Sequence, residues 1–272
     1  MSGKLSLSKL KGVPKTLLLP LRGRYLETKR HDGIIKDHKA VEIFDTIDHD
    51  FHVEELPWIG QILFSARTEI LDQAVKRFLE INPESVVVNL GCGLDTRSHR
   101  VDNGKVLWYD LDLSECIELR RQLIPETDRF KMISGSVLDF SWMDGIPKDK
   151  PTLFIAEGLF CYFKREQVKQ IMFAIKDNFA NSELILEAFS PLIKLSMYRH
   201  KQVRDAFSLF QWMIDKGKSL EKWHSQIKFV DQWNYFDRYP ERWRWIRHIR
   251  HIPIVRRTMK IVHLRFVSSQ TA

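Results

Sequence analysis

The sequence has few cysteines and no long apolar run, and each absence excludes a class of protein. Its 272 residues contain only three cysteines, Cys92, Cys116 and Cys161, which are odd in number and form no C-x-x-C pair. A disulfide framework and a cysteine-rich zinc site are therefore not expected. The run T-L-L-L at residues 16–19 is too short for a signal sequence or a bilayer span. We expect a cytoplasmic protein without a bound metal.

Internal repeats, low-complexity tracts and linker-like stretches are also absent from the sequence. A chain of this length can bury the core of one large α/β domain. We therefore expect a single domain with three parts. These are a helical N-terminal cap over residues 1–64, a core over 65–190, and further helices with a terminal strand over 191–272.

The segment 85–97, S-V-V-V-N-L-G-C-G-L-D-T-R, organises this core. Its apolar, β-branched run is typical of a strand that is covered on both faces. Gly91 and Gly93 follow directly, and they allow a sharp turn and the close approach of a ligand. A dinucleotide fingerprint would need a third glycine where Thr96 stands, and the carboxylate of Asp95 would repel a pyrophosphate. The sulfonium cation of S-adenosylmethionine suits this acidic turn better.

Strand and helix patterns alternate along the chain on both sides of the glycine turn. This alternation predicts an α/β fold with a doubly wound parallel sheet, in which the last strand lies near an edge. The expected strands cover residues 86–90, 105–111, 130–133, 151–156, 183–189 and 260–267. The expected helices cover residues 21–30, 34–44, 65–81, 114–123, 168–179 and 201–216.

Acidic residues follow the ends of two predicted strands. Asp110 and Asp112 stand about 20 residues after Gly91, where a carboxylate can accept hydrogen bonds from ribose hydroxyls. They could instead cap the helix expected at 114–123. Glu157 follows the fourth predicted strand, and open α/β sheets bind ligands at the carboxyl ends of their strands. These carboxylates are candidate ligand-binding residues.

Two further candidates rest on weaker signals. Asp139 and Phe140 follow the third predicted strand, where the carboxylate could bind an adenine amino group and the ring could cover the base. Arg67 lies in the first turn of the helix expected at 65–81, with Ser65 as its N-cap. The helix dipole disfavours a cation there, which indicates a functional role, although a solvated arginine is equally consistent.

The formal net charge of +8 has a strong contribution from the C-terminal region. Between Arg242 and Arg257, arginines alternate with tryptophan and isoleucine. A basic, tryptophan-rich helix can lie on a membrane surface, and a basic region can also recruit nucleic acid. We favour the simpler interpretation of a helix with one packed face and one solvated arginine face.

Three motifs together resemble the leucine carboxyl methyltransferase family, which includes the tetracenomycin-type polyketide O-methyltransferases of bacteria. They are V-N-L-G-C-G-L-D-T-R at 88–97, W-Y-D-L-D-L at 108–113, and A-E-G-L followed by Y-F at 156–163. The similarity extends from about Pro20 to the terminal strand. It implies a seven-stranded class I methyltransferase (Rossmann-like) fold that uses S-adenosylmethionine, with residues 65–190 binding the cofactor and 191–272 facing the acceptor.

The resemblance also implies a role for each candidate residue. It places the methionine part of the cofactor on Arg67, Gly91, Gly93 and Glu157. It places the ribose on Asp112, with Asp110, and the adenine on Asp139 and Phe140. Tyr162 would face the acceptor as the candidate catalytic residue. His38 stands where the family usually has proline, and the long insertions of the phosphatase-modifying members are missing, so a small-molecule acceptor is expected.

The predicted reaction is an in-line displacement, which requires the acceptor oxygen, methyl carbon and sulfur to be collinear in a water-poor site. A carboxylate is already ionised at neutral pH, whereas a hydroxyl needs a base. The ten histidines are scattered, so a carboxylate is mildly favoured. The alternatives are a noncatalytic adenosine-ligand binding protein and a nucleic-acid methyltransferase. Against the latter, A-E-G-L at 156–159 replaces the N-P-P-Y type of tetrapeptide.

Overall fold

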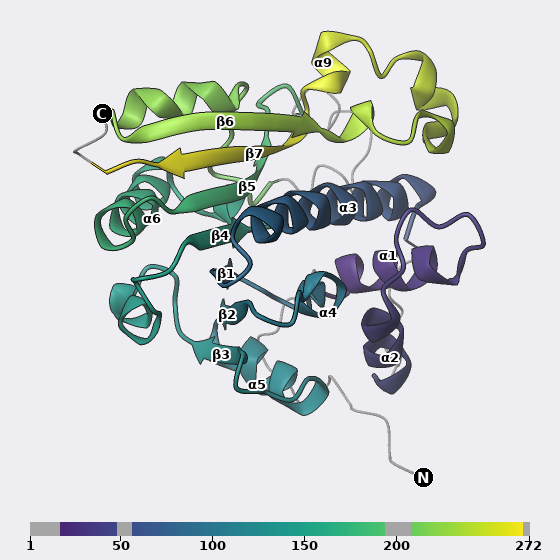
Figure 1. Cartoon of the computed structure of the whole chain (residues 1–272). Coiled ribbons are helices and arrows are strands. Elements are labelled where there is room, and N and C mark those ends of the chain that lie inside the picture. The colour runs from purple at the N-terminus through teal and green to yellow at the C-terminus, as the bar shows by residue number, and fades with distance from the viewer. Residues whose placement is uncertain (1–16, 48–55, 194–207, 269–272) are drawn as a thin grey trace.

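A computed structural model describes residues 17–47, 56–193 and 208–268 of the chain (Figure 1). A seven-stranded sheet runs through the middle of the molecule, and helices lie on both of its sides. The strand order is β3-β2-β1-β4-β5-β7-β6. The strands are β1 (Val86–Leu90), β2 (Leu107–Asp112), β3 (Phe130–Ser134), β4 (Thr152–Ala156), β5 (Glu183–Phe189), β6 (Ile227–Asn234) and β7 (Met259–Phe266).

The sheet confirms the predicted α/β class and corrects one feature of it. Strands β1 to β5 are parallel, as expected, but β7 runs antiparallel to both β5 and β6. Strand β7 lies next to the edge, as predicted, and the edge strand β6 was not predicted. The sequence of β6, I-K-F-V-D-Q-W-N, alternates weakly because much of this strand is exposed. An edge strand of this kind gives little periodic signal.

The helices surround this sheet. They are α1 (Leu18–Lys29), α2 (His38–Thr46), α3 (Trp58–Ile81), α4 (Arg97–Val101), α5 (Ser114–Leu123), α6 (Arg165–Asn178) and α9 (Pro253–Arg256). Figure 1 shows α3 and α6 on opposite sides of the sheet. Short 3₁₀ segments cover Phe140–Gly145, Phe160–Tyr162, Gly217–Trp223, Tyr235–Asp237 and Pro240–His248. The predicted helices at 114–123 and at the N-terminus are confirmed, with shifted ends in the latter case.

Strand β1 shows why the sheet has two cores. All five of its residues are buried. Val87 packs in the cluster that includes α3 and α5, whereas Val86 and Val88 pack in the cluster that includes α6. Successive side chains of a strand point to opposite faces, so a continuous apolar run fits a sheet that is covered on both sides. Each buried valine contributes about 1.5–3 kcal/mol relative to an exposed one.

Helix α3 corrects the expected position of Arg67. The helix begins at Trp58 rather than near Ser65, and the Ser65 hydroxyl donates to the backbone oxygen of Gln61 at 2.7 Å instead of capping. The side-chain oxygen of a mid-helix serine commonly bonds one turn back in this way. Arg67 therefore lies well inside α3, and the argument from an unfavourable helix dipole does not apply to it.

The C-terminal third departs most from the predicted helices. Residues 208–216 are not helical, and the rest of the helix predicted at 201–216, residues 201–207, lies outside the described residues. The arginine-rich region forms 3₁₀ turns over Pro240–His248 and the short α9 rather than one amphipathic helix. Helix-like spacing of bulky residues was present, but a left-handed residue, Arg244 at φ 46°, interrupts the turns. None of the described helices is both long and apolar enough to cross a membrane.

Candidate active site

A cavity of about 330 Å³ lies where β1, β4 and β5 end. Five of the nine predicted site residues line it, namely Arg67, Gly91, Gly93, Glu157 and Tyr162. They come from α3, the turn after β1 and the segment after β4, so the fold gathers residues that are up to 95 positions apart, from 67 to 162. The sheet edge predicted to bind a ligand is thus the edge that carries the cavity.

The glycine turn forms a tight backbone cradle in the cavity wall. Gly91 and Gly93 have φ values of +63° and +50°, a conformation that other residues adopt only under strain. A β-carbon on Gly91 would come within 2.7 Å of Leu159 Cδ1, and one on Gly93 within 2.9 Å of Leu17 Cδ2. Both positions therefore favour glycine for its conformation, and a side chain at either would also have to displace a leucine methyl group.

Asp112 and Asp110 lie beside this cradle in different ways. The Asp112 carboxylate accepts a hydrogen bond from the Gly93 backbone N–H at 2.7 Å, so it touches the turn directly. Asp110 is buried and pairs with Arg120, whose guanidinium also donates to the backbone oxygen of Gly93 at 2.7 Å. Asp112 thus contacts the turn directly, whereas Asp110 contacts it through Arg120, and neither carboxylate is among the residues that line the cavity. The alternative role of these carboxylates as side-chain caps is not seen, since no side chain caps α5.

Arg67 joins two buried carboxylates at the floor of the cavity. Its guanidinium lies 2.6 Å from Glu157 Oε1 and 3.0 Å from Glu187 Oε2. The Tyr235 hydroxyl donates to the other oxygen of Glu187 at 2.6 Å. Arg67 Nε is buried and has no hydrogen-bond partner among the described residues. The arginine is therefore held firmly, yet one of its donors remains unsatisfied beside the cavity.

The two carboxylates on Arg67 ionise differently. Burial opposes ionisation of Glu157, but Arg67 and Arg97 outweigh it and lower the Glu157 pKa. Burial also raises the pKa of Glu187, and there Arg67 and Tyr235 compensate only in part. Two carboxylates that share a guanidinium therefore have pKa values displaced in opposite directions.

Behind the cavity, Arg97 extends the ionic network toward the surface. Its guanidinium lies 2.6 Å from Glu157, 2.5 Å from Asp95 and 2.8 Å from Asp72. Asp95 is buried and lines the cavity, and although burial opposes its ionisation, the surrounding arginines lower its pKa. The acidic residue that the sequence placed near the ligand is thus neutralised by the protein and serves to fix the glycine turn.

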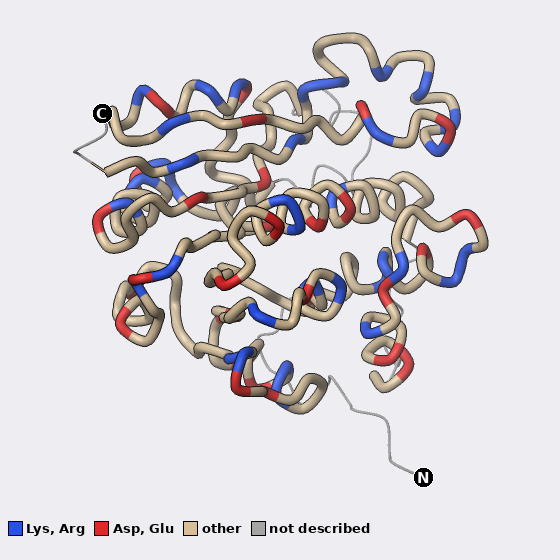
Figure 2. The backbone as a smooth tube through the Cα atoms, in the orientation of Figure 1, with Lys and Arg blue, Asp and Glu red and all other residues tan. Residues whose placement is uncertain are grey.

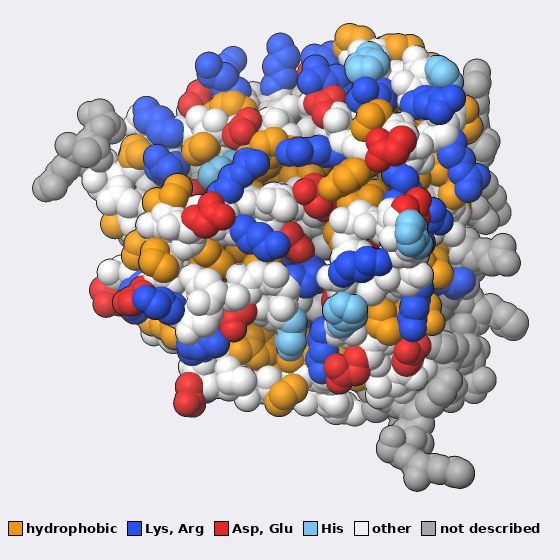
Figure 3. Space-filling model, turned by 45° about the vertical axis from the view of Figure 1, so that its right-hand side comes forward, with side chains coloured by type: hydrophobic (Ala, Val, Ile, Leu, Met, Phe, Trp, Pro, Cys, Tyr) orange, Lys and Arg blue, Asp and Glu red, His pale blue; other side chains and the backbone are white. Residues whose placement is uncertain are grey.

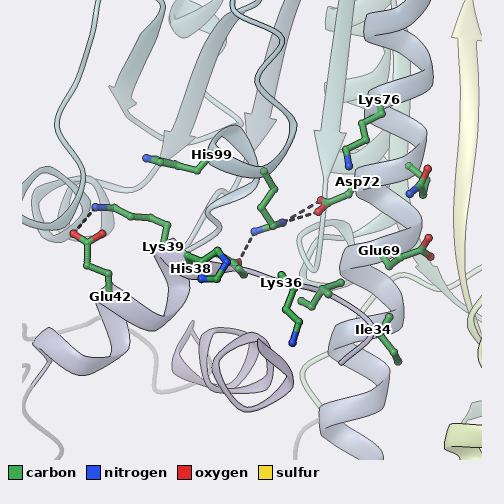
Figure 4. Close-up of a pocket in the computed structure, with 13 residues that line it drawn as sticks. Ile34, Lys36, His38, Lys39, Glu42, Glu69, Asp72, Lys76 and His99 are labelled. Atoms are coloured by element: carbon green, nitrogen blue, oxygen red, sulfur yellow. Dashed lines mark hydrogen bonds and ion pairs between the residues drawn. The ribbon is translucent and has the colours of Figure 1, made fainter. Parts of the chain in front are cut away.

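A second and larger hollow of about 560 Å³ lies on the outer side of this network (Figure 4). Asp72 on α3 and Arg100 line it, and both also belong to the network. Its charged lining residues are balanced between four acidic and four basic side chains: Asp37, Glu42, Glu69, Asp72, Lys36, Lys39, Lys76 and Arg100. This balance selects no ligand charge, so we place the active site in the smaller cavity.

Asp139 and Phe140 are not among the residues that line the cavity. Asp139 is exposed and accepts a hydrogen bond from the Ser141 backbone N–H at 3.2 Å, which starts a 3₁₀ turn. Phe140 packs half-buried against the core on the α6 side of the sheet. The adenine contacts assigned to these two residues stay a prediction.

Apolar side chains line another part of the cavity, which we call the apolar wall and define by Cys161, Tyr162, Phe189, Phe210 and Met259. The Tyr162 ring lies edge-on to Phe210 at 5.4 Å between centroids. Burial raises the pKa of Tyr162 to about 12, so its hydroxyl stays protonated at neutral pH. The part of the cavity lined by Arg67, Gly91, Gly93, Glu157 and Glu187 is called the charged wall below.

Sequence reasoning missed Glu187, Tyr235 and most of the apolar wall. Glu187 carried a usable signal, because it is a charged residue inside the otherwise apolar run L-I-L-E-A-F of β5. A charge in a strand that is buried on both faces must be paired, so a partner such as Arg67 could have been sought. Phe210 and Met259 carried no such signal, since aromatic and apolar residues are common in any core.

The family follows from a direct comparison. A family model described as leucine carboxyl methyltransferase matches residues 21–176, more than half of the 272 residues. The chain belongs to the leucine carboxyl methyltransferase family. This membership confirms the resemblance found in the sequence, and it makes the protein a methyltransferase that depends on S-adenosylmethionine.

Two relatives in the family cover most of the chain. The tetracenomycin polyketide synthesis O-methyltransferase TcmP of Streptomyces glaucescens is 32% identical over 231 residues, which span 84% of this chain and 85% of the relative. The S-adenosyl-L-methionine-dependent methyltransferase dpfgK of Gibberella zeae is 26% identical over 253 residues, with coverage of 85% and 84%. The similarity therefore extends well beyond the glycine motif.

Solved structures confirm the fold. A putative methyltransferase from Thermobifida fusca superposes with a TM-score of 0.60 at 15% identity, covering 78% of this chain and 84% of its own. A DUF574 family protein from Streptomyces avermitilis gives a TM-score of 0.59 at 12% identity, with coverage of 90% and 97%. The chain thus has the predicted class I methyltransferase fold.

The charged wall fits the cofactor. Arg67 offers a donor without a partner, which a carboxylate such as that of methionine would satisfy. The oxygens of Glu157 each accept one bond from an arginine and retain further lone pairs for an amino group. The cradle at Gly91 and Gly93 leaves backbone exposed where a side chain would block it. The residues present therefore match the polar groups of S-adenosylmethionine.

Proposed function

We propose that the protein transfers a methyl group from S-adenosylmethionine to an oxygen atom of a small aromatic or polyketide-like molecule. The observation that carries this proposal is that the charged wall and the apolar wall line the same cavity. The charged wall suits the methionine part of the cofactor, and Tyr162, Phe189 and Phe210 of the apolar wall suit a flat, apolar acceptor. The name of the relative TcmP, a polyketide O-methyltransferase, supports the same chemistry.

Each candidate residue has a proposed role in holding the cofactor. Arg67 would bind the methionine carboxylate and Glu157 the amino group, while Asp112 would accept hydrogen bonds from the ribose. The backbone at Gly91 and Gly93 would lie under the methionine part. Asp110 would act through Arg120 by fixing the turn, and Asp139 with Phe140 would meet the adenine.

The proposed reaction requires the protein to align the acceptor with the methyl group rather than to transfer a proton. When bound, the cofactor supplies an electrophilic methyl group on a sulfonium. The chain's own residues would hold the acceptor in line with that group and exclude water. Phe189, Phe210 and Met259 supply the apolar surface for this purpose. Tyr162 is the candidate catalytic residue, and its protonated hydroxyl would donate a hydrogen bond to the acceptor.

The cavity favours a carboxylate over a hydroxyl as the acceptor group. No histidine occurs among the described residues that line it. Glu157 and Glu187 are both bound to Arg67, and the high pKa of Tyr162 keeps its proton in place. A hydroxyl acceptor would require a free base, whereas a carboxylate arrives already ionised.

The proposal is tested by incubating the purified protein with methyl-labelled cofactor and matched aromatic acceptors. The two members of each pair share one ring system, and one member carries a carboxyl group where the other carries a hydroxyl group. We expect label to enter the carboxylated member and to be released by mild base, since esters hydrolyse and aryl ethers do not. Base-stable label would move the assignment to a hydroxyl. Absence of label from every oxygen acceptor, with intact cofactor binding, would contradict O-methylation of such molecules.

The two alternatives from the sequence lack comparable support. Membership of a methyltransferase family counts against a noncatalytic binding protein. A nucleic-acid acceptor would require basic side chains for its phosphates near the methyl group. The basic residues among the described cavity lining are Arg24 and Arg67, and both are buried in ion pairs with carboxylates. Labelled transfer to RNA or DNA in the same assay would revive that alternative.

A further inference from the structure

Residues 236–258, which we call the arginine-rich segment, form the long connection between β6 and β7 and include the short helix α9 (Figure 1). The segment contains seven arginines and only two acidic residues, Asp237 and Glu241. Figure 2 shows basic positions at several places along the arginine-rich segment. This one connection therefore carries much of the positive charge of the protein.

One side of the segment is anchored to the fold. Trp243 and Ile246 are buried against Ile62 and Ala66 of α3. Between Trp243 and the neighbouring Trp245, Arg244 has a left-handed backbone with φ 46° and ψ −126°. Such a conformation is costly for a residue with a side chain, so the surrounding packing must hold it. The kink leaves one tryptophan buried and the next exposed.

The other side presents apolar and basic groups together. Trp245, Ile252 and Ile254 are 63%, 48% and 47% exposed, which is unusual for side chains of this size. Arg244 and Arg247 are exposed beside them. Figure 3 shows basic, histidine and apolar side chains gathered in this upper part of the surface, around the position of α9. Basic side chains also occur elsewhere on this face, so it is the three exposed apolar side chains close together in sequence that distinguish the segment.

Some arginines of the segment pair with internal carboxylates and others do not. Arg256 pairs with Asp237 at 2.6 Å, and Arg242 pairs with Glu27 at 2.8 Å. In contrast, Arg244, Arg247 and Arg250 contact no carboxylate within the described part of the chain. Three arginines are thus available to an external anion.

We propose that residues 244–256 form a docking surface for an anionic lipid bilayer. Exposed tryptophan and isoleucine can enter the interfacial region while arginines remain at the headgroups, which is the arrangement of membrane-surface segments. Nucleic acid would attract the arginines and could stack on Trp245, but it gives no comparable burial to Ile252 and Ile254. The exposed aliphatic pair therefore favours lipid.

The arginine-rich segment lies next to the cavity, so membrane docking would affect how an acceptor reaches it. Tyr235 directly precedes the segment and Met259 directly follows it, and both line the cavity. Leu63 also lines the cavity and packs against the cluster that anchors the segment. A bilayer bound here would lie close to the apolar wall, so an apolar acceptor could enter from the lipid phase.

The test is co-sedimentation of the full-length protein with vesicles. One set contains phosphatidylcholine alone, and the other contains phosphatidylcholine with phosphatidylserine. We expect the partition coefficient to be at least about tenfold higher on the anionic set at low salt, and to fall at high salt because screening weakens exposed charges. This readout needs no methyl transfer, so it can fail while the proposed function holds.

Variants separate the apolar contribution to membrane binding from the electrostatic contribution. Trp245→Ser with Ile254→Ser should lower the partition coefficient at least about tenfold, since two apolar side chains no longer leave water. Arg247→Gln should lower it about fivefold, as expected for one arginine at an anionic surface. Ile81→Ser, which changes a still more exposed isoleucine at the end of α3, should have no effect. Unchanged binding of S-adenosylhomocysteine would show that each variant is folded.

Three results would overturn the proposal. They are equal binding to neutral and anionic vesicles, vesicle binding that survives both sets of variants, and an equal loss in the Ile81→Ser control. Binding of a labelled RNA oligonucleotide that depends on Trp245 and Arg247, together with no vesicle binding, would assign the surface to nucleic acid instead.

Discussion

The two walls of the cavity are built on different principles. In the charged wall, Arg67 and Glu157 each contact two charged partners. The glycine turn is fixed because Gly93 N–H donates to Asp112 and the Gly93 oxygen accepts from Arg120. In the apolar wall, Phe189 and Phe210 pack at 4.7 Å between ring centroids without directional bonds to a ligand position. The first wall specifies the position of each polar group, whereas the second specifies only size and apolarity.

This difference explains why the cofactor is easier to assign than the acceptor. Directional contacts require particular residues at particular places, so a short motif carries them. Apolar contacts tolerate many combinations of side chains with a similar volume. A change in the charged wall should therefore abolish binding or stability, while a change in the apolar wall should mainly alter acceptor preference.

The largest effect is expected from Gly91→Val. The substitution places a side chain on a left-handed backbone, at a cost of roughly 1–2 kcal/mol, and drives a β-carbon to 2.7 Å from Leu159. We expect the affinity for S-adenosylhomocysteine to fall by about a hundredfold or more, which corresponds to about 2.7 kcal/mol. Calorimetric titration of the purified variant measures this loss.

Gly104→Val is the matched control for that experiment. Gly104 has a similarly positive φ of +80°, but a β-carbon there meets no atom within 4 Å, and the residue does not line the cavity. It should reproduce the backbone strain in a thermal melt without the loss of affinity. Equal weakening of ligand binding in both variants would mean that strain, rather than the cradle, explains the result.

A second prediction compares the two carboxylates that share Arg67. Glu157→Gln should lower the free energy of unfolding at pH 7 by about 3 kcal/mol or more, because it removes an ionised partner from two buried arginines. Glu187→Gln should cost about 1 kcal/mol, because burial already disfavours the charge of Glu187. Urea unfolding between pH 4 and pH 7 measures both.

The pH dependence should distinguish them further. The pKa of Glu157 is below its ordinary value of 4.5, so its ionised form stabilises the fold above that pH and this contribution is lost as the pH falls through the folded pKa. The pKa of Glu187 is raised, so its contribution is present below 4.5 and is lost as the pH rises through the folded pKa. The difference in free energy of unfolding between wild type and Glu157→Gln should therefore grow as the pH rises, and the difference between wild type and Glu187→Gln should shrink. Differences that change in the same direction with pH would contradict this assignment.

The same contrast shows what the sequence could predict. The glycine turn, the strand ends at Asp112 and Glu157, and the five parallel strands all rest on local patterns, and the structure confirms the strands and the fold class. Arg67 was selected for a reason that proved wrong, because the start of α3 was misplaced by seven residues, from Trp58 to Ser65. Its position in the cavity depends on packing of α3 against the sheet.

The features that escaped prediction depend on contacts distant in sequence. Glu187 belongs to the site because it pairs with Arg67, which is 120 positions away in the sequence. Tyr235 belongs to it because its hydroxyl donates to Glu187. Strand β6 pairs only with β7 at an exposed edge, so its periodicity is weak. The arginine-rich segment has helical spacing, but its backbone kinks at Arg244, between Trp243 and Ile246, which are buried against α3. No local pattern in the sequence records that packing.

The smallest effect is expected from Tyr162→Phe in the apolar wall. Tyr162 is partly exposed, and its side chain contributes mainly a ring that packs against Phe210. Since a pKa of about 12 keeps the hydroxyl protonated, loss of the hydroxyl removes at most one neutral hydrogen bond, and we expect kcat to fall less than about tenfold. The pH profile of kcat between 6 and 9 should keep its shape. A fall of more than a hundredfold with a changed profile would make Tyr162 a proton-transfer group, and the apolar wall would then need to specify chemistry as strictly as the charged wall does.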